Sequence, residues 1–317
     1  MSNWQLPEGI DELTGQQAAA FEIARRSLID AYMQAGYELV IPPMVENVDS
    51  MLLASTEVDQ KTFKFLDPLS TKMLGVHADI TPQIARIDAK HGSDAVKKYC
   101  YVNAILQTKA DDFYQSRSPI QAGAELYGAD TLESDVEVIK LMLESMSLLG
   151  ISPVVLSLGN VAIFNTLIAK ESLTEEQAQT LREIFVKRSN PDLQNFIGQH
   201  QLNNEALFST LMTLEGEANV LDTALEVFAG FDDIKEAVAR VKAIGQALDN
   251  TGVEIIYDLA ETKAYGYHTG VIFSAYHQDY SKALAQGGRY NNIGQAFGQS
   301  RAATGFSFDL KFLSNNH

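Results

Sequence analysis

Cysteine is almost absent from this sequence, since Cys100 is the only one among 317 residues. A single thiol cannot close an intrachain disulfide, and it cannot supply a thiolate cluster for a metal ion. The six histidines are scattered, without a His-x-x-x-His pair or a mixed histidine and cysteine group. These absences favour a chain that works in the reducing cytoplasm, with no metal site and no cofactor.

Long hydrophobic runs are absent too. No stretch of 18 or more apolar residues exists, so no membrane span is expected. The N-terminus, MSNWQLPEG, has no basic region followed by an apolar one, so no secretory signal is expected. Basic residues number 24 against 41 acidic ones, and the net charge is −17. Nucleic-acid binding draws on lysine and arginine at phosphates, so we expect no nucleic-acid partner.

What the sequence does contain is a pattern of helices and strands. Capping boxes are expected at Thr14 with Gln17 and at Ser134 with Glu137. Helices are predicted at 18–33, at 81–91, from 134 to 150 and throughout 161–249, and strands at 37–41, 62–66, 72–76, 99–107, 120–127, 154–158, 253–259, 271–275 and 303–308. Strands and helices do not alternate as βαβ units, so the fold class is α+β, an antiparallel sheet flanked by helices. We expect one domain, 1–317, interrupted by a helical insertion at about 161–249.

Polar side chains interrupt the apolar strand predicted at 120–127. Gln121 and Glu125 are four residues apart, so both point to one face of the sheet. Two such groups inside an apolar strand are costly without partners, which indicates a binding site. Upstream, Asp79 and Thr81 precede a proline and could simply cap a helix. A buried carboxylate there would equally suit an ammonium group.

Four segments, in order along nearly the whole chain, resemble the histidyl-tRNA synthetases, a family of class II aminoacyl-tRNA synthetases. They are residues 18–46, like the dimer-forming motif with Pro42 or Pro43 as its proline; residues 76–81, in place of Arg-Pro-Glu-Gly-Thr; residues 106–128, like the second motif and the Gln-x-Gly-x-Glu-x-x-Gly segment; and residues 265–270 with 287–290, like the two histidine-specific signatures. The resemblance implies a class II synthetase-like fold and a site for histidine.

The histidine site implied by the resemblance has eight residues. They are Asp79 and Thr81 on the amino group with Gln121 helping, Glu125 on the imidazole with His268 aiding, Tyr267 and Tyr290 as walls or hydroxyl partners, and Lys263 as a candidate for the carboxylate. His268 replaces the second tyrosine of the family's Tyr-Tyr-Thr-Gly, and Lys263 replaces an arginine.

The groups that run ATP chemistry in this family are missing. Two arginines stabilise the charge of the transition state, and losing one such donor costs about 2.7–4 kcal/mol. Here the second-motif arginine is Gln107 and its glutamate is Lys109. The third-motif arginine is Phe312, and Asp309 stands where a glycine is usual. Arg117 aligns with an arginine of the synthetases. Adenylation is therefore expected to be lost.

A histidine site without a reaction resembles one branch of the family, the regulatory subunits of short-form ATP phosphoribosyltransferases. The resemblance implies a non-catalytic chain that dimerises and joins catalytic subunits in a hetero-octamer. It would activate them and mediate feedback inhibition by L-histidine at the first step of histidine biosynthesis. The sequence stops five residues after Phe312, so no anticodon-binding domain is expected.

Three other functions remain open. The chain could be a divergent histidine–tRNA ligase, which would have to tolerate Gln107 and Phe312. It could be a stand-alone histidine sensor for a different partner. It could itself transfer phosphoribosyl groups, but Asp111-Asp112 lacks the apolar strand and the glycine and threonine loop that would cradle phosphates.

Overall fold

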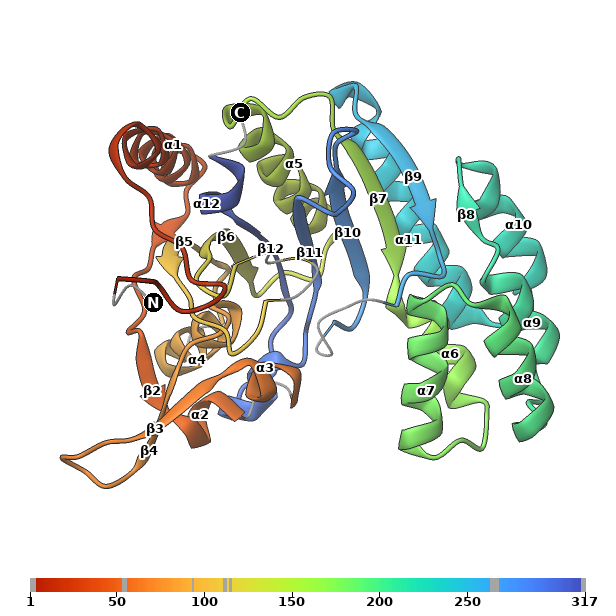
Figure 1. Ribbon diagram of the computed structural model, residues 1–317. Helices are drawn as coiled ribbons and strands as arrows, with labels where there is room; N and C mark the ends of the chain where they lie inside the picture. Colours follow the sequence, from red (N-terminus) through yellow and green to blue (C-terminus); the bar gives the residue numbers. More distant parts are fainter. Residues whose placement is uncertain are drawn as a thin grey trace. The chain divides into compact units, whose positions relative to one another are not determined.

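A computed structural model describes residues 4–52, 56–92, 94–110, 113, 116–262 and 268–314, without the side chains of residues 52, 56 and 57. The chain forms two compact units (Figure 1). The first unit combines Met1–Val154 with Ala275–His317, and the second is Val155–Ser274. The N-terminal and C-terminal parts of the sequence therefore share one unit.

The first unit is organised by a sheet. Its hydrogen-bonded order is β1 (Glu38–Leu39), β5 (Lys97–Ala104), β6 (Ile120–Tyr127), β12 (Ala303–Asp309), β11 (Ala285–Arg289) and β10 (Val271–Tyr276), the last of which has residues in both units. The pairs β5–β6, β6–β12 and β12–β11 are antiparallel, as predicted. However, β1 runs parallel to β5. The long connection between these strands permits a parallel pairing that the residue pattern alone does not show.

Helices cover both faces of this sheet (Figure 1). On one face lie α1 (Gly15–Gln34), α5 (Leu132–Leu148) and the short α12 (Leu310–Leu313), and on the other lie α4 (Thr81–His91) and the turn η2 (Ile293–Phe297). Tyr32 of α1 meets Phe306 of β12 edge to face, with ring centroids 6.1 Å apart. Because side chains alternate along a strand, Phe306 and Phe308 point to the α1 face, whereas Gly305 and Ser307 point to the α4 face.

A small three-stranded sheet extends from the same unit. It consists of β2 (Val45–Asn47), β4 (Met73–Val76) and β3 (Phe63–Leu66), and it is accompanied by α2 (Val48–Leu52) and α3 (Thr56–Lys61). The predicted β3–β4 hairpin is confirmed, and Asp67 closes its turn by accepting from the backbone N–H groups of Leu69 and Ser70. Leu69 at this turn is exposed, and so is Trp4 near the N-terminus, with 91% of its surface accessible.

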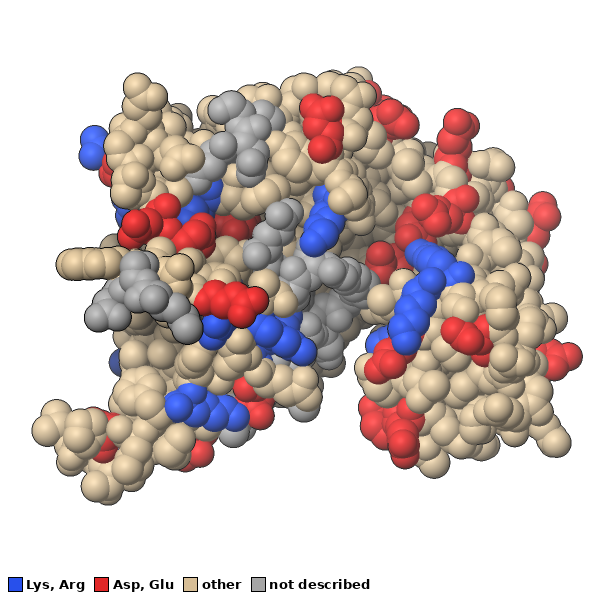
Figure 2. Space-filling view, in the orientation of Figure 1, with Lys and Arg blue, Asp and Glu red and all other residues tan. Residues whose placement is uncertain are grey.

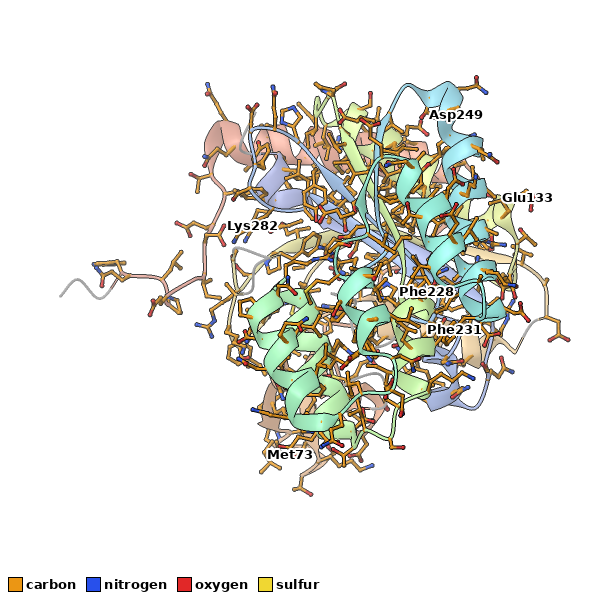
Figure 3. All side chains as sticks on the ribbon, turned by 90° about the vertical axis from the view of Figure 1, so that its right-hand side faces the viewer. Met73, Glu133, Phe228, Phe231, Asp249 and Lys282 are labelled. Atoms are coloured by element: carbon orange, nitrogen blue, oxygen red, sulfur yellow. The ribbon has the colours of Figure 1, made fainter. Side chains whose placement is uncertain are left out.

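The second unit is mostly helical. Its strands are β7 (Val155–Asn160), parallel to β9 (Glu254–Asp258), and β8 (Glu215–Gly216), antiparallel to β9; its helices are α6 (Val161–Ala169), α7 (Glu175–Val186), α8 (Asn190–His200), α9 (Glu205–Leu211), α10 (Asn219–Val227), α11 (Asp232–Leu248) and the turn η1 (Asp249–Thr251). The parallel β7–β9 pair also departs from the predicted antiparallel sheet. Phe228 and Phe231, between α10 and α11, meet edge to face at 6.4 Å (Figure 3).

Helix capping differs from the prediction. Thr14 is the N-cap of α1, but its side chain makes no capping hydrogen bond. In α5 the capping box joins Thr131 to Ser134, three residues before the predicted box, because Thr131 is the extended residue that precedes the helix. Glu137 instead accepts from the hydroxyl of Tyr37 at 3.0 Å.

Helix hydropathy and the distribution of basic side chains bear on membrane and nucleic-acid binding. Among the described residues, no helix is both long and apolar enough to cross a bilayer. On the face drawn in Figure 2, the lysine and arginine side chains of the described residues form separate small groups among acidic ones.

Candidate functional site

A buried carboxylate lies on the α4 face of the first unit. Glu125 of β6 is 1% exposed and accepts three hydrogen bonds from hydroxyl groups. Thr81 Oγ1, at the start of α4, donates to Glu125 Oε1 at 2.9 Å, and the hydroxyl of Tyr101 in β5 donates to the same oxygen at 3.0 Å. The hydroxyl of Tyr290, which follows β11, donates to Oε2. Three segments far apart in sequence thus meet at one side chain.

The charge on this carboxylate is disfavoured. Burial raises the pKa of Glu125 to about 8, against the opposing effect of the hydroxyls of Tyr290, Thr81 and Tyr101, and the nearby Asp79 raises it further. A carboxyl group in such surroundings holds its proton at neutral pH unless a cation arrives. A positively charged or protonatable ligand is therefore the partner that its chemistry suits.

A second carboxylate, Asp79, is held beside Thr81. Its Oδ1 accepts from Gln121 Nε2 at 2.9 Å and from the backbone N–H of Thr81 at 3.2 Å. Gln121 Oε1 in turn accepts from the backbone N–H of Ile80 at 2.9 Å. The N-cap residue of α4 is Ile80, and it makes no side-chain cap. Asp79 therefore contacts the helix start without being the N-cap residue, and Gln121 fixes its position from the sheet.

The structure brings five of the eight predicted residues together in the first unit: Asp79, Thr81, Gln121, Glu125 and Tyr290. His268 belongs to the second unit, so its place beside the imidazole stays a prediction. Lys263 and Tyr267 lie outside the described residues. Tyr101 was missed by the sequence analysis. Its only signal is a tyrosine on a predicted strand, and the cross-strand register that aims it at Glu125 is not visible in sequence.

The position of the lost second-motif arginine faces inward. Gln107 is buried, and its Nε2 donates to the backbone carbonyl of Ala78 at 3.0 Å. Its Oε1 has no hydrogen-bond partner among the described residues. Because the amide nitrogen is occupied, the free end of Gln107 is an acceptor. An acceptor repels a carboxylate or phosphate, so Gln107 reverses the polarity as well as removing the charge of an arginine.

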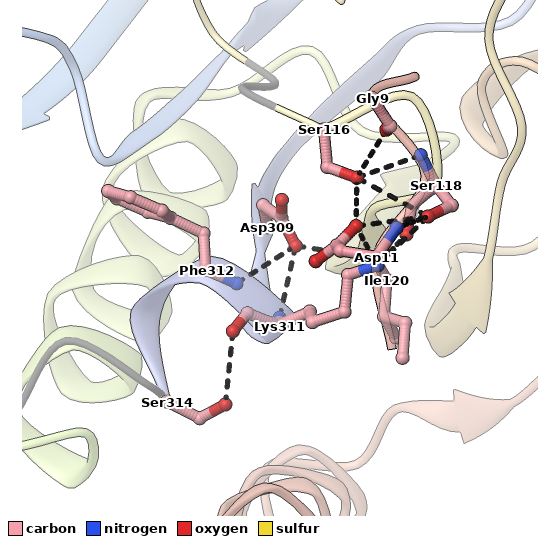
Figure 4. A network of polar contacts seen from close by, with 9 residues as sticks. All are labelled: Gly9, Asp11, Ser116, Ser118, Ile120, Asp309, Lys311, Phe312 and Ser314. Atoms are coloured by element: carbon pink, nitrogen blue, oxygen red, sulfur yellow. Dashed lines mark hydrogen bonds and ion pairs between the residues drawn. The ribbon is translucent and has the colours of Figure 1, made fainter. Parts of the chain in front are cut away.

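The third-motif region is internally satisfied (Figure 4). Asp309 Oδ1 accepts from the backbone N–H groups of Ile120 at 3.2 Å, Lys311 at 3.0 Å and Phe312 at 3.3 Å, so it caps α12. Lys311 is 5% exposed, and its ammonium donates to Asp11 Oδ1 at 2.8 Å and to Ser118 Oγ at 3.1 Å. Burial raises the pKa of Asp309 to about 6, opposed by its backbone hydrogen bonds and by Lys311.

Arg117 is also engaged within the protein. Its guanidinium donates to the carbonyl of Gln107 at 3.2 Å and to that of Glu8 at 2.9 Å, and it lies 5.2 Å from the ring centroid of Phe63. Lys109 is exposed, and Asp111 and Asp112 lie outside the described residues. Arg117 and Lys311 are thus bound to the protein itself rather than left to meet a phosphate. Among the described residues, no group of histidine, cysteine and acidic side chains is arranged to hold a metal ion.

Comparison with known proteins identifies the fold. The model of the family described as histidyl-tRNA synthetase matches residues 9–313. A crystal structure from Bacillus halodurans, titled as an ATP phosphoribosyltransferase regulatory subunit/histidyl-tRNA synthetase, superposes with a TM-score of 0.88 at 23% identity, covering 100% of this chain and 85% of that one. The fold is therefore that of the histidyl-tRNA synthetases, a class II synthetase core.

Relatives in sequence show which branch of the histidyl-tRNA synthetase group this chain belongs to. The ATP phosphoribosyltransferase regulatory subunit of Methylococcus capsulatus is 40% identical, covering 98% of this chain and 78% of the relative. The corresponding protein of Thiobacillus denitrificans is also 40% identical, covering 99% of this chain and 98% of the relative. The chain belongs to the family of ATP phosphoribosyltransferase regulatory subunits, within the histidyl-tRNA synthetase group. These two relatives carry the name of a regulatory subunit and not of a catalytic one.

Proposed function

We propose that this chain regulates a short-form ATP phosphoribosyltransferase: it assembles with the catalytic subunits, raises their activity, and lowers it when L-histidine binds. One observation carries the proposal. Glu125 and Asp79 keep hydrogen-bonded positions on one face of the sheet, while Arg117 and Lys311 are engaged inside the protein. A site that suits a cationic ligand is thus retained where the means of handling phosphate is reduced.

Histidine carries groups of opposite charge to the two carboxylates. Its α-ammonium group would meet Asp79, oriented by Gln121, and its imidazole would meet Glu125. Lys263, Tyr267 and His268 complete the proposed site. Inhibition then follows from linkage, because histidine must bind the inactive arrangement of the complex more tightly than the active one. A tenfold preference at each site contributes about 1.4 kcal/mol.

The assembly and location are part of the same proposal. The segment from α1 to β2 would form the dimer contact, as its resemblance to the dimer-forming motif implies. Dimers would join catalytic subunits in a hetero-octamer in the cytoplasm.

Isothermal titration of L-histidine, and then of ATP, into the purified chain tests the binding site. We expect histidine to bind and ATP not to bind. Glu125→Gln should weaken histidine at least about tenfold, because an amide cannot pair with an imidazolium ion. Glu137→Gln is the matched control: Glu137 also accepts from a tyrosine hydroxyl, at 3.0 Å, but it lies on α5 and should leave the affinity unchanged.

Mixing the chain with a short-form catalytic subunit tests the partner. A complex on size-exclusion chromatography, with higher phosphoribosyl transfer that histidine suppresses, is the expected result. Histidine binding without any complex would favour a stand-alone sensor. ATP binding with pyrophosphate exchange would instead favour a histidine–tRNA ligase and would contradict the proposal.

A further inference from the structure

Two glycines make room for Glu125 and for its hydroxyl partner Tyr101. Gly305 of β12 lies directly opposite Glu125 in the antiparallel pair, and a Cβ on Gly305 would overlap Glu125 Oε2 and lie 2.7 Å from the hydroxyl of Tyr290. Gly123, two residues before Glu125, lies opposite Tyr101 of β5, and a Cβ there would lie 2.6 Å from the Tyr101 hydroxyl. The tyrosine therefore reaches diagonally over Gly123 to the glutamate.

The hydrogen bonds that Glu125 makes to described residues fit its ionised form, and they occupy three of its acceptor positions. An ionised carboxylate has about four lone-pair sites and donates nothing. The hydroxyls of Thr81, Tyr101 and Tyr290 supply three donors. A fourth donor would complete the set. In the neutral acid the Glu125 O–H would need an acceptor, so one of these hydroxyls would have to accept from the carboxyl group instead of donating to it.

Among the residues that the structure describes, the ionisable groups that interact with Glu125 carry no positive charge. They are Asp79 before α4, Tyr37 before β1, Tyr101 on β5, Tyr127 on β6 and Tyr290 after β11. All are acids, and the pKa of Tyr127 and that of Tyr290 are both raised by burial and by Glu125 itself. Among the described residues, no lysine or arginine bonds to Glu125. The described surroundings of Glu125 thus supply hydroxyl donors for a carboxylate, and the described groups bonded to it carry no positive charge.

We propose that Glu125 protonates the imidazole of L-histidine as it binds, and that Tyr101 is the positioning residue that stabilises the carboxylate so formed. The ring arrives neutral, the Glu125 O–H bond breaks, and an N–H bond forms on the ring. The new imidazolium N–H is a further donor to the carboxylate, and its positive charge is one that no described partner of Glu125 supplies. This inference rests on the proposed histidine site.

The proton balance sets the pH dependence. Free imidazole has a pKa of about 6.5, and burial raises the pKa of Glu125 to about 8. Between these values a protonated acid meets a neutral ring, and binding moves one proton internally with none exchanged. Below this window the ring is already charged and Glu125 must release its proton. Above it Glu125 is already ionised and the ring must take a proton from water. Affinity should fall about tenfold per pH unit on either side.

Titration of L-histidine across this pH range, in two buffers of different ionisation enthalpy, measures the exchanged protons. We expect proton release on the acid side, near-zero exchange in the window and proton uptake on the alkaline side. NMR of ring-¹⁵N-labelled L-histidine bound at about pH 7.5 should show both ring nitrogens carrying a proton.

Tyr101→Phe tests the positioning role. Loss of one donor to the ionised carboxylate should raise the pKa of Glu125 and move the alkaline limb upward by about one pH unit, while the acid limb, which belongs to the ligand, stays in place. Tyr32→Phe is the matched control, since its hydroxyl bonds to Ser145 at 3.0 Å on the α1 face. It should shift neither limb, although it also removes a buried hydroxyl.

The outcomes separate the two proposals. Histidine bound with a neutral ring would overturn the proton transfer and leave the histidine site intact. An alkaline limb that moves equally in Tyr101→Phe and Tyr32→Phe would overturn the positioning role of Tyr101. If the wild-type chain binds no histidine at any pH, both the proposed site and this inference are wrong.

Discussion

The strands β6 and β12 carry two buried carboxylates, and these accept hydrogen bonds from different kinds of donor. At one register Glu125 of β6 faces Gly305 of β12, and four residues along, Asp309 of β12 faces Gln121 of β6. Glu125 is surrounded by side-chain hydroxyls, and burial raises its pKa to about 8. Asp309 accepts from three backbone N–H groups, and burial raises its pKa to only about 6.

The two carboxylates differ in whether their hydrogen-bond partners can rearrange. Backbone donors cannot turn away, so Asp309 is a permanent cap on α12. Hydroxyl hydrogens can rotate, so the shell of Glu125 can adapt when a ligand donor arrives. In this chain the Asp309 end joins the Lys311–Asp11 pair, whereas the Glu125 end keeps partners that can rearrange.

Gly305→Ala should have the largest effect, because it disturbs the surroundings of Glu125 and leaves those of Asp309 in place. The new methyl group would overlap Glu125 Oε2, so Glu125 has to leave its hydroxyl partners. We expect a loss of about 3 kcal/mol in the free energy of unfolding and at least about tenfold weaker histidine binding. Urea unfolding and histidine titration measure the two effects. Gly198→Ala on α8, where a Cβ meets nothing within 4 Å, should be neutral or stabilising by up to about 1 kcal/mol.

Lys311→Met should lower stability around Asp309 without affecting the surroundings of Glu125. Lys311 is buried and bonds to Asp11 and Ser118, so its loss should cost about 2 kcal/mol in the free energy of unfolding. Lys98→Met is the control, because Lys98 pairs with Glu137 at 2.6 Å in a more exposed position and should cost under about 1 kcal/mol. Histidine affinity should stay at the wild-type value in both variants. A weakened affinity in Lys311→Met would show that the two ends are not independent.

Asp309→Asn should have an effect on stability that depends on pH. The folded-state pKa of Asp309 is raised above the ordinary value of 3.8, so the folded protein holds this proton more tightly than the unfolded chain. Its contribution to stability is therefore full below about pH 4 and is lost as the pH rises through about 6. Asparagine has no proton to lose. Relative to wild type, the variant should gain about 2 kcal/mol between about pH 4 and pH 7 in urea unfolding. A constant difference would contradict the assigned pKa shift.

Where the residue pattern is local, the sequence was a good guide to the fold. The strand at 120–127 agrees with β6 to the residue, and the helix at 81–91 agrees with α4. Strand β11 at Ala285–Arg289 was missed, because its Gly-Gly pair breaks the apolar alternation. The parallel partner of β1 was also missed. Pairing partners depend on contacts distant in sequence, which periodicity does not contain.

The candidate site likewise contains residues that the sequence predicted and residues that it did not. Resemblance pointed to Gln121 and Glu125, and strand alternation alone put them on one face. It could not point to Tyr101, whose role depends on the register of β5 against β6. Nor could it foresee that the N-terminal segment would satisfy Arg117 and Lys311, through the carbonyl of Glu8 and the carboxylate of Asp11.

That N-terminal segment has an optical consequence. Trp4 is the single tryptophan and is 91% exposed, whereas the chain has 12 tyrosines, of which Tyr101 and Tyr290 are buried against Glu125. Indole fluorescence should therefore report on the segment that leads to Glu8 and Asp11, and it should respond little to changes around Glu125. The ultraviolet absorbance of Tyr101 and Tyr290 should change with the ionisation of Glu125, because their hydroxyls bond to its carboxyl group. Tryptophan fluorescence and tyrosine absorbance thus report separately on the N-terminal segment and on the surroundings of Glu125, without any added label.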